Sequence, residues 1–366
     1  MKKNFLVLFA LMLTLAGCKN DSENKVKIAV NLPLTGYIGV YGERMQTGMD
    51  LARKDLAASM KSDNIFLDFD YQDNRGETKD AITIFNKQKI QNPDIYMSGI
   101  TAQTSAIQEQ TRKAGILHFL WSWTPLYMEK GLNEFRAWLN FGAEAQMYVD
   151  YISKQSPKRL AYFHINNLGS KTQREQVVVP ALKKQFSDLE VYAEEYPPTM
   201  TDFKNLIAKV KDFNPDVFIV SGYKESIINM IKDIDTYKID RNKVYCSMDL
   251  LEAIDEVPAE IMEGFHVSAP EFNIPSMQTE KTKQWIELFK KDFKRNPVYT
   301  EAYGYDCVQS IYEAAKIARN DKISLSEALH KVSFDGITGH VSYSEDGDIE
   351  NHLHTAVFKN GVLILE

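Results

Sequence analysis

Short apolar runs alternate with longer amphipathic segments along most of this chain of 366 residues, and this alternation is the feature that most constrains its fold. The apolar runs have the length of strands, and the amphipathic segments repeat their apolar residues with a helical period. The first round predicts strands at residues 26–32, 65–71, 95–98 and 117–121, separated by helices at residues 43–59, 78–91 and 106–114. Such an alternation indicates parallel βαβ units.

The same alternation restarts near residue 145. It predicts helices at residues 145–153, 172–186, 202–213 and 226–236, and strands at residues 160–165, 191–196, 217–221 and 244–247. Hydrophobic residues make up 44% of the chain, which is enough to form more than one core. Two consecutive rounds of this size therefore predict an α/β fold with two doubly wound parallel-sheet lobes.

The C-terminal third has a different pattern. Two long helices are predicted at residues 276–293 and 300–319, followed by a shorter helix at residues 325–332. Short strands then follow at residues 339–343, 354–358 and 362–365, with a turn at Asp346-Gly347-Asp348. There is no short-period repeat, so the duplication is one of architecture.

The N-terminus has the layout of a secretory signal. Lys2 and Lys3 precede the apolar run 5–15, which is shorter than the roughly 20 residues that a membrane-spanning helix needs. The run ends in Leu-Ala-Gly before Cys18, and this resembles a bacterial lipobox, in which the cysteine becomes the lipidated first residue. We therefore expect a signal peptide at residues 1–17, a lipid-modified Cys18 and a polar tether at residues 18–25. These features predict an extracytoplasmic protein, in the periplasm or on the cell surface, that is anchored to a membrane.

Charge and cysteine content restrict the function classes further. The formal net charge is −7 and no basic run is present, which argues against nucleic acid as a partner because phosphate binding needs clustered Lys and Arg. Apart from Cys18, the cysteines are Cys246 and Cys307. Their apolar contexts favour buried thiols, although a disulfide between them remains open at this stage.

Polar and aromatic residues follow several of the predicted strands, where open α/β sheets bind their ligands. The loop after the first strand carries Tyr41, which either covers a ligand or packs on its own lobe. The segment 99–104 includes Thr101 and Ala102 and leads into a helix, whose N-terminal N–H groups and dipole favour an anion such as a carboxylate. Thr101 is equally suited to cap that helix, and the two roles are compatible.

The next strand ends in Trp121-Ser122-Trp123-Thr124. Alternate residues of a strand face opposite sides, so we expect Trp121 and Trp123 on one face and Ser122 on the other. Two tryptophans beside a serine can form an aromatic wall with a polar floor. Ser122, Trp123 and Thr124 are therefore candidate ligand contacts, although one of the tryptophans can belong to the core instead.

Catalytic and metal-binding motifs are not found in the sequence. Residues 345–348 lack the acidic spacing of a calcium loop and read more simply as a hairpin turn. His352 and His354 share a strand face but have no third ligand at a suitable spacing, which favours a solvated edge over zinc. No nucleophile elbow, zinc-protease motif or phosphate loop is present, so we expect neither an enzyme nor a cofactor.

Taken in order, several short motifs resemble the type I periplasmic binding proteins of the branched-chain amino-acid (leucine/isoleucine/valine) class. They span about residue 26 to the C-terminus: Leu32-Pro33-Leu34-Thr35-Gly36, Gly42, Gly48, Asp73, Ala114-Gly115-Ile116-Leu117, Ala302-Tyr303-Gly304-Tyr305-Asp306, Phe334-Asp335-Gly336-Ile337-Thr338-Gly339 and Glu345-Asp346-Gly347-Asp348. The resemblance implies three crossovers between the lobes, near Phe141, Pro270 and Gly339. Lobe one would comprise residues 26–141 plus 271–338, and lobe two residues 142–270 plus 339–366.

The resemblance also assigns roles at the site. It implies that Thr101 and Thr124 hold a ligand carboxylate, that Asp249 from lobe two holds the ammonium, and that Tyr41 and Tyr223 contact the ligand. Two positions depart from the family pattern: Leu168 replaces a tyrosine that commonly contacts ligand, and Trp123 replaces a small residue that offers its backbone. A small polar, amino-acid-like ligand fits the pattern.

The resemblance implies a partner as well. A binding protein of this class closes its lobes on a ligand and delivers it to an ABC-type permease. The alternative is a sensor lipoprotein of the same fold that signals to a partner protein without transport.

Overall fold

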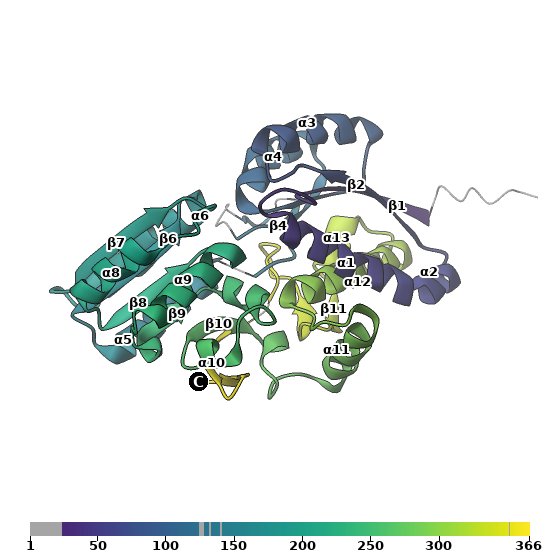
Figure 1. The fold of residues 1–366 in the computed structure, drawn as a ribbon. Coiled ribbons are helices and arrows are strands. Elements are labelled where there is room, and N and C mark those ends of the chain that lie inside the picture. Colours follow the sequence, from purple (N-terminus) through teal and green to yellow (C-terminus); the bar gives the residue numbers. More distant parts are fainter. Residues whose placement is uncertain (1–23, 124–127, 132, 140, 351) are drawn as a thin grey trace, which may run out of the picture.

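Two separate β-sheets, each covered by helices, form the two lobes of the protein (Figure 1). The computed structural model describes residues 24–123, 128–131, 133–139, 141–350 and 352–366. The predicted signal peptide, Cys18 and Thr124 lie outside the described residues. The predicted α/β fold with two parallel-sheet lobes is confirmed.

The first lobe is built on a five-stranded sheet with the order β2-β1-β3-β4-β5, in which every neighbouring pair is parallel. Its strands are β1 (Lys25–Leu32), β2 (Phe66–Asp73), β3 (Ile95–Gly99), β4 (Leu117–Trp121) and β5 (Glu134–Arg136). Its first helices are α1 (Gly39–Asp55), α2 (Ala57–Asp63), α3 (Thr78–Gln88) and α4 (Thr101–Ala114). The polar segment that we expected ahead of a helix at residue 106 is thus already the first turn of α4.

The second lobe is built on a seven-stranded sheet with the order β14-β13-β10-β9-β8-β6-β7. Its parallel strands are β6 (Arg159–Ile165), β7 (Glu190–Tyr196), β8 (Val217–Ser221), β9 (Val244–Cys246) and β10 (His266–Pro270). The antiparallel strands β13 (Leu353–Lys359) and β14 (Val362–Leu365) extend the sheet at one edge. Its helices are α5 (Phe141–Gln155), α6 (Leu168–Thr172), α7 (Val179–Gln185), α8 (Lys204–Phe213), α9 (Lys224–Thr236) and α10 (Ala259–Met262). A π-helical segment (Gln173–Val178) joins α6 to α7.

The chain returns to the first lobe for its longest helix. α11 (Glu280–Phe293), α12 (Tyr299–Asp321) and α13 (Leu325–Leu329) lie there, and α12 packs directly on α1 (Figure 1). Glycines permit that approach: a Cβ atom on Gly48 of α1 would overlap the backbone carbonyl of Glu301, and one on Gly304 of α12 would overlap that of Met45. The helix pair therefore rests on backbone-to-backbone contact.

The third crossover lies later in the chain than the expected position near Gly339. β11 (Ser333–Asp335) pairs with β12 (His340–Ser342), and Asp348 forms a parallel bridge with Arg136 of β5. The Arg136 guanidinium also lies 2.7 Å from the Asp348 carboxylate. These contacts keep the chain on the first lobe through the turn at residue 347, so it enters the second sheet only at β13. The other two passages of the chain between the sheets precede α5 and follow β10.

Cys246 in β9 and Cys307 in α12 are both free and buried, as their apolar contexts indicated, and they belong to different lobes. Within the described ranges, every helix is too short or too polar to cross a bilayer.

Candidate functional site

A cavity of about 60 Å³ lies between the two lobes, at the carboxyl ends of their parallel strands. Lobe one contributes residues that follow β3 and β4, and lobe two contributes residues that follow β6 and β8. The carboxyl ends of the strands of an open α/β sheet are where ligands bind. The cavity therefore lies where the strand order predicts a ligand.

A hydrogen bond between Tyr41 and Asp249 joins the lobes across this cavity. Tyr41 lies on α1, and Asp249 on the 3₁₀ helix Met248–Ala253 of lobe two. The Tyr41 hydroxyl donates to Asp249 Oδ1 over 2.9 Å and accepts from the backbone N–H of Lys224 over 3.0 Å. The Ser247 hydroxyl donates to the other carboxyl oxygen over 3.3 Å. The Tyr41 hydroxyl thus connects lobe one to lobe two through an acidic side chain and a backbone N–H group.

Burial changes the acid–base properties of that group. It raises the pKa of Asp249 from 3.8 to about 8, and the nearby Glu144 carboxylate acts in the same direction, while the hydrogen bond from Tyr41 opposes it. The pKa of Tyr41 is likewise raised well above its ordinary value, mainly by burial. A cationic ligand group beside Asp249 would favour the ionised carboxylate, because an opposite charge within about 4–6 Å stabilises it.

The N-terminus of α4 faces the cavity from lobe one. Thr101, its first residue, lines the cavity, and its hydroxyl lies 3.4 Å from the Ser122 hydroxyl. Ile100 precedes it with φ = 66°, an unusual conformation for a β-branched residue. The first N–H groups of a helix have no intrahelical acceptor and, with the helix dipole, favour an anion. A positive φ at Ile100 turns the chain sharply from β3 into this helix end.

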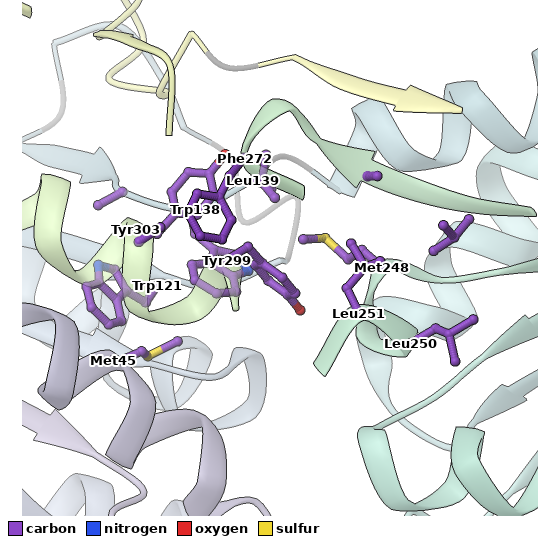
Figure 2. Close-up of a cluster of buried hydrophobic side chains, with 14 of the residues drawn as sticks. Met45, Trp121, Trp138, Leu139, Met248, Leu250, Leu251, Phe272, Tyr299 and Tyr303 are labelled. Atoms are coloured by element: carbon purple, nitrogen blue, oxygen red, sulfur yellow. The ribbon is translucent and has the colours of Figure 1, made fainter. Parts of the chain in front are cut away.

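Several lining residues are aromatic, and Figure 2 shows Trp121, Trp138 and Tyr299 within a cluster of buried hydrophobic side chains. Trp121 stacks on Trp138 with centroids 6.1 Å apart, and Trp138 packs against Tyr299 at 5.5 Å. Tyr223 lies 5.7 Å from Tyr41 at the other end of the cavity. Rings provide apolar surface with little rotamer freedom to lose, which suits a preformed site.

Lobe two closes the cavity with α6 and the segment after β8. Asn167 caps α6 by accepting a hydrogen bond from the Ser170 N–H over 2.8 Å, and both residues line the cavity. Leu168, which departs from the family pattern, is 61% exposed and does not line the cavity. Gly222 also lines it, and a Cβ atom there would overlap the Tyr196 hydroxyl.

The structure brings together Tyr41, Thr101, Trp123, Tyr223 and Asp249, all predicted from the sequence, around this cavity. Of the other candidates, Ser122 is buried and reaches the cavity through Thr101, whereas Ala102 is exposed in the first turn of α4 and does not line it. Thr124 is outside the described residues.

Sequence reasoning missed Trp138, Tyr299 and Asn167. Trp138 follows β5, a strand of three residues that is too short to show a period-2 pattern. The sequence could have predicted Asn167 as a site residue, because it follows a predicted strand and asparagine is a preferred helix N-cap residue.

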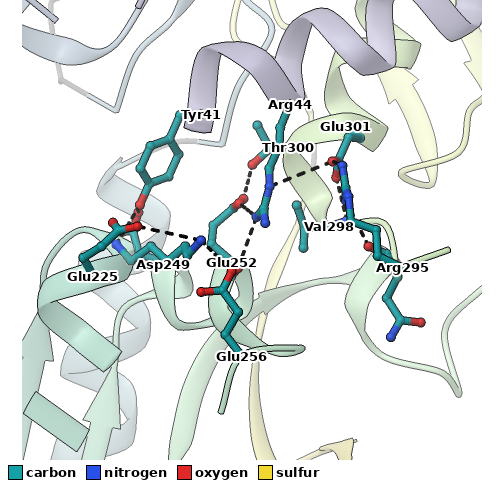
Figure 3. A network of polar contacts seen from close by, with 12 residues as sticks. Tyr41, Arg44, Glu225, Asp249, Glu252, Glu256, Arg295, Val298, Thr300 and Glu301 are labelled. Atoms are coloured by element: carbon teal, nitrogen blue, oxygen red, sulfur yellow. Dashed lines mark hydrogen bonds and ion pairs between the residues drawn. The ribbon is translucent and has the colours of Figure 1, made fainter. Parts of the chain in front are cut away.

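A network of ionic contacts joins the lobes beside the cavity (Figure 3). Arg44 of α1 forms an ion pair with Glu252 of lobe two and also donates to the Glu252 backbone carbonyl over 3.1 Å. The Glu252 carboxylate accepts a further hydrogen bond from Thr300 of α12. Lys224 pairs with Glu256 at 2.6 Å. Arg44 and Lys224 are thus each paired with a carboxylate.

No group of three or more His, Cys, Asp or Glu side chains in the described part of the chain is arranged to hold a metal ion. His354, one of the two strand histidines, lies 3.6 Å from the Glu271 carboxylate instead.

The fold and the site together define a two-lobed α/β protein that encloses a small ligand between its lobes. A family model described as "periplasmic binding protein" matches residues 25–361, and the chain belongs to this family. Its members are extracytoplasmic solute-binding proteins, and the class expected from the sequence is confirmed.

Curated relatives and solved structures agree with this family. The "Leu/Ile/Val-binding protein homolog 1" of Brucella abortus is 25% identical over 342 residues, which cover 88% of this chain and 87% of the relative. The branched-chain amino-acid transporter substrate-binding protein LivJ of Streptococcus pneumoniae, solved with isoleucine, superposes with a TM-score of 0.78 at 20% identity, covering 93% and 97% of the chains. A Rhodopseudomonas palustris solute-binding protein solved with benzoate superposes with a TM-score of 0.79 at 16% identity, and the match covers 93% of this chain and 95% of that protein.

Proposed function

We propose that this protein is a lipid-anchored solute-binding protein that captures a small amino-acid-like ligand and delivers it to an ABC-type importer. The observation that carries the proposal is the opposite polarity of the two sides of the cavity. Asp249 on lobe two offers a carboxylate to a ligand ammonium, and the N-terminus of α4 with Thr101 on lobe one offers hydrogen-bond donors to a ligand carboxylate. A dipolar α-amino acid matches both.

Closure supplies the mechanism. A ligand that lies first on lobe one gains contacts with lobe two only when the lobes close, and this difference is what favours the closed form. In the closed form Asp249 bonds to the Tyr41 hydroxyl. A ligand ammonium adds a charged partner to the same carboxyl group and so strengthens closure.

Lipid anchoring is part of the proposal and rests on the sequence of the N-terminus. We expect Cys18→Ser to release the protein from membranes, because the acyl chains supply about 0.8 kcal/mol for each buried CH₂ group. Fractionation of cells that express each form measures this, and retention of the variant in the membrane fraction would count against the anchor.

The first experiment is thermal unfolding of a form that begins after Cys18, with a panel of aliphatic amino acids, aromatic amino acids, benzoate and short amides. A ligand at about 1,000 times its Kd stabilises a protein by roughly 4 kcal/mol, which shifts a melt visibly. Stabilisation by an α-amino acid supports the proposal. Benzoate is included because a structural neighbour was solved with it, and stabilisation by benzoate alone would overturn the amino-acid assignment.

A further inference from the structure

Glu144 is a buried carboxyl group that the proposed binding mechanism does not use. It lies in the first turn of α5, directly after the first crossover between the lobes, and is 1% exposed. It does not line the cavity. A carboxyl group taken out of water costs stability unless several donors compensate it, so its contacts indicate what it does.

Among the donors that reach this carboxyl group, two come from separate segments of lobe two. The backbone N–H of Met248, the residue before Asp249, donates to Glu144 Oε1 over 3.0 Å. The Gln173 side-chain amide donates to Glu144 Oε2 over 3.1 Å. Gln173 begins the π-helical segment after α6, the helix whose N-terminal region lines the cavity. Glu144 therefore ties two of the ligand-facing segments of lobe two to the helix that starts at the crossover.

Glu144 also acts on Asp249 through its charge, because the surroundings of both carboxyl groups contain few positive charges. The groups that face Asp249 are Tyr41 from α1, Tyr196 from β7, Tyr223 before α9, Glu252 from its own 3₁₀ helix, Tyr299 from α12 and Glu144 from α5. The groups that face Glu144 are Tyr148, Tyr162, Tyr245 and Tyr299. All of these are acids or neutral phenols, and Arg44 and Lys224 pair with other carboxylates.

We propose that Glu144 is a positioning residue of the ligand cavity: it fixes the segment that carries Asp249, and its negative charge opposes ionisation of Asp249 until a cationic ligand group arrives. The site then discriminates for a ligand that brings its own positive charge. This last statement rests on the proposed function, whereas the coupling between the two carboxyl groups does not.

The direction of the coupling is fixed by their charges. Burial raises the pKa of Glu144 to about 7 and that of Asp249 to about 8, and each carboxylate disfavours ionisation of the other. Glu144→Gln keeps an acceptor for the Met248 N–H and removes the charge. It should therefore lower the pH at which Asp249 ionises. We expect a shift of about one pH unit, because neighbouring sites that titrate as a coupled pair interact by at least about this much.

The experiment is a ¹³C NMR titration of the ligand-free protein labelled at the aspartate carboxyl carbons. Asp249→Asn assigns the Asp249 resonance, and its midpoint is compared between the wild type and Glu144→Gln. Glu134→Gln is the matched control, because Glu134 is also buried but lies in lobe one and pairs with Arg112. A lower midpoint in Glu144→Gln with an unchanged one in Glu134→Gln is the expected result. An unchanged midpoint in Glu144→Gln would overturn the proposal.

If Glu144→Gln does not fold, Gln173→Met replaces it. Loss of that donor favours the neutral form of Glu144, so the Asp249 midpoint should fall here too. Calorimetry with leucine across the same pH range is the second readout: the wild type should lose affinity on acidification at a higher pH than Glu144→Gln. If no protein binds leucine, the ligand assignment fails, yet the NMR titration still decides the role of Glu144.

Discussion

At the scale of single residues, Asp249 has an unusual set of partners for a buried acid. Its hydrogen bonds come from the hydroxyl groups of Tyr41 and Ser247, and its pKa is raised to about 8 by burial. Near neutral pH most of it is therefore protonated in the ligand-free closed form. A ligand ammonium favours the ionised form of Asp249, because a charge-assisted hydrogen bond offsets the cost of a buried carboxylate.

Asp249→Asn tests that interaction with nearly the same shape. We expect amino-acid affinity to fall by roughly 2–5 kcal/mol, the usual loss when one partner of a buried charged pair is truncated. The unfolding free energy without ligand should not fall, since the amide removes a buried ionisable group. Calorimetry and chemical denaturation measure the two quantities, and Asp255→Asn, at an exposed contact with Asn296, is the control. Unchanged affinity would reject the amino-acid orientation.

At the scale of elements, the packing of α1 on α12 depends on the absence of side chains at Gly48 and Gly304. In Gly48→Ala the new methyl group would overlap the Glu301 backbone carbonyl, which no rotamer change relieves. Alanine gains about 1 kcal/mol in helix propensity, but overpacking costs about 1–3 kcal/mol and more where backbone must move. We expect a lower unfolding free energy by urea denaturation, and no loss for Glu43→Ala on the exposed side of α1. A more stable Gly48→Ala would contradict this packing.

The elements also show how far the sequence could be read. Period and length predicted most of the parallel strands of both lobes, though not β5 and β10. The polar strand ends pointed to Thr101, whereas Tyr223 and Asp249 followed only from the resemblance to the family. The start of α4 was missed because it depends on a positive φ at Ile100. Isoleucine rarely adopts this conformation, so the sequence does not predict it. The position of the third crossover was missed because it is fixed by the contact of Asp348 with Arg136, far away in the sequence.

At the scale of the whole molecule, buried ionisable groups set the pH dependence of stability. The folded-state pKa values of Asp249 and Glu144 are raised from 3.8 and 4.5 to about 8 and about 7. The folded state therefore binds more protons than the unfolded chain, and stability falls as pH rises through this window. The buried imidazoles of His118, His164 and His266 have pKa values below 6.5, so they lower stability as pH falls below 6.5.

We therefore expect the melting temperature of the ligand-free protein to be highest near pH 6.5 and to decrease toward about pH 8. Each group that is protonated in one state and ionised in the other changes the free energy of unfolding by about 1.4 kcal/mol for each pH unit. Asp249→Asn should flatten the alkaline decrease and steepen the loss of stability below pH 6.5, because the carboxyl group that holds an extra proton in the folded state between about pH 4 and pH 8 is gone. Melts across this pH range measure the effect, and an equally steep decrease in the variant would show that Asp249 does not contribute.

The ion pair between Arg44 and Glu252 joins the two lobes in the closed form. The Glu252 side chain has no exposed surface and that of Arg44 is 13% exposed. Breaking such a pair costs about 3–5 kcal/mol while the remaining charge stays buried. Glu252 and Arg44 lie on different lobes, so opening returns Glu252 to water and avoids that cost. We therefore expect Arg44→Met to open the ligand-free protein rather than unfold it, with a larger radius of gyration in small-angle X-ray scattering and weaker ligand binding.

Two variants make this expectation specific to the buried pair. Arg53→Met removes a cation from the same helix whose partner, Asp50, is at the surface, and it should leave the radius unchanged. Adding Glu252→Gln to Arg44→Met removes the stranded charge and should restore the closed dimensions, since the coupling of two neighbouring residues appears only in the double variant. If Arg44→Met instead lowers the melting temperature at an unchanged radius, the pair stabilises one closed structure and does not control opening.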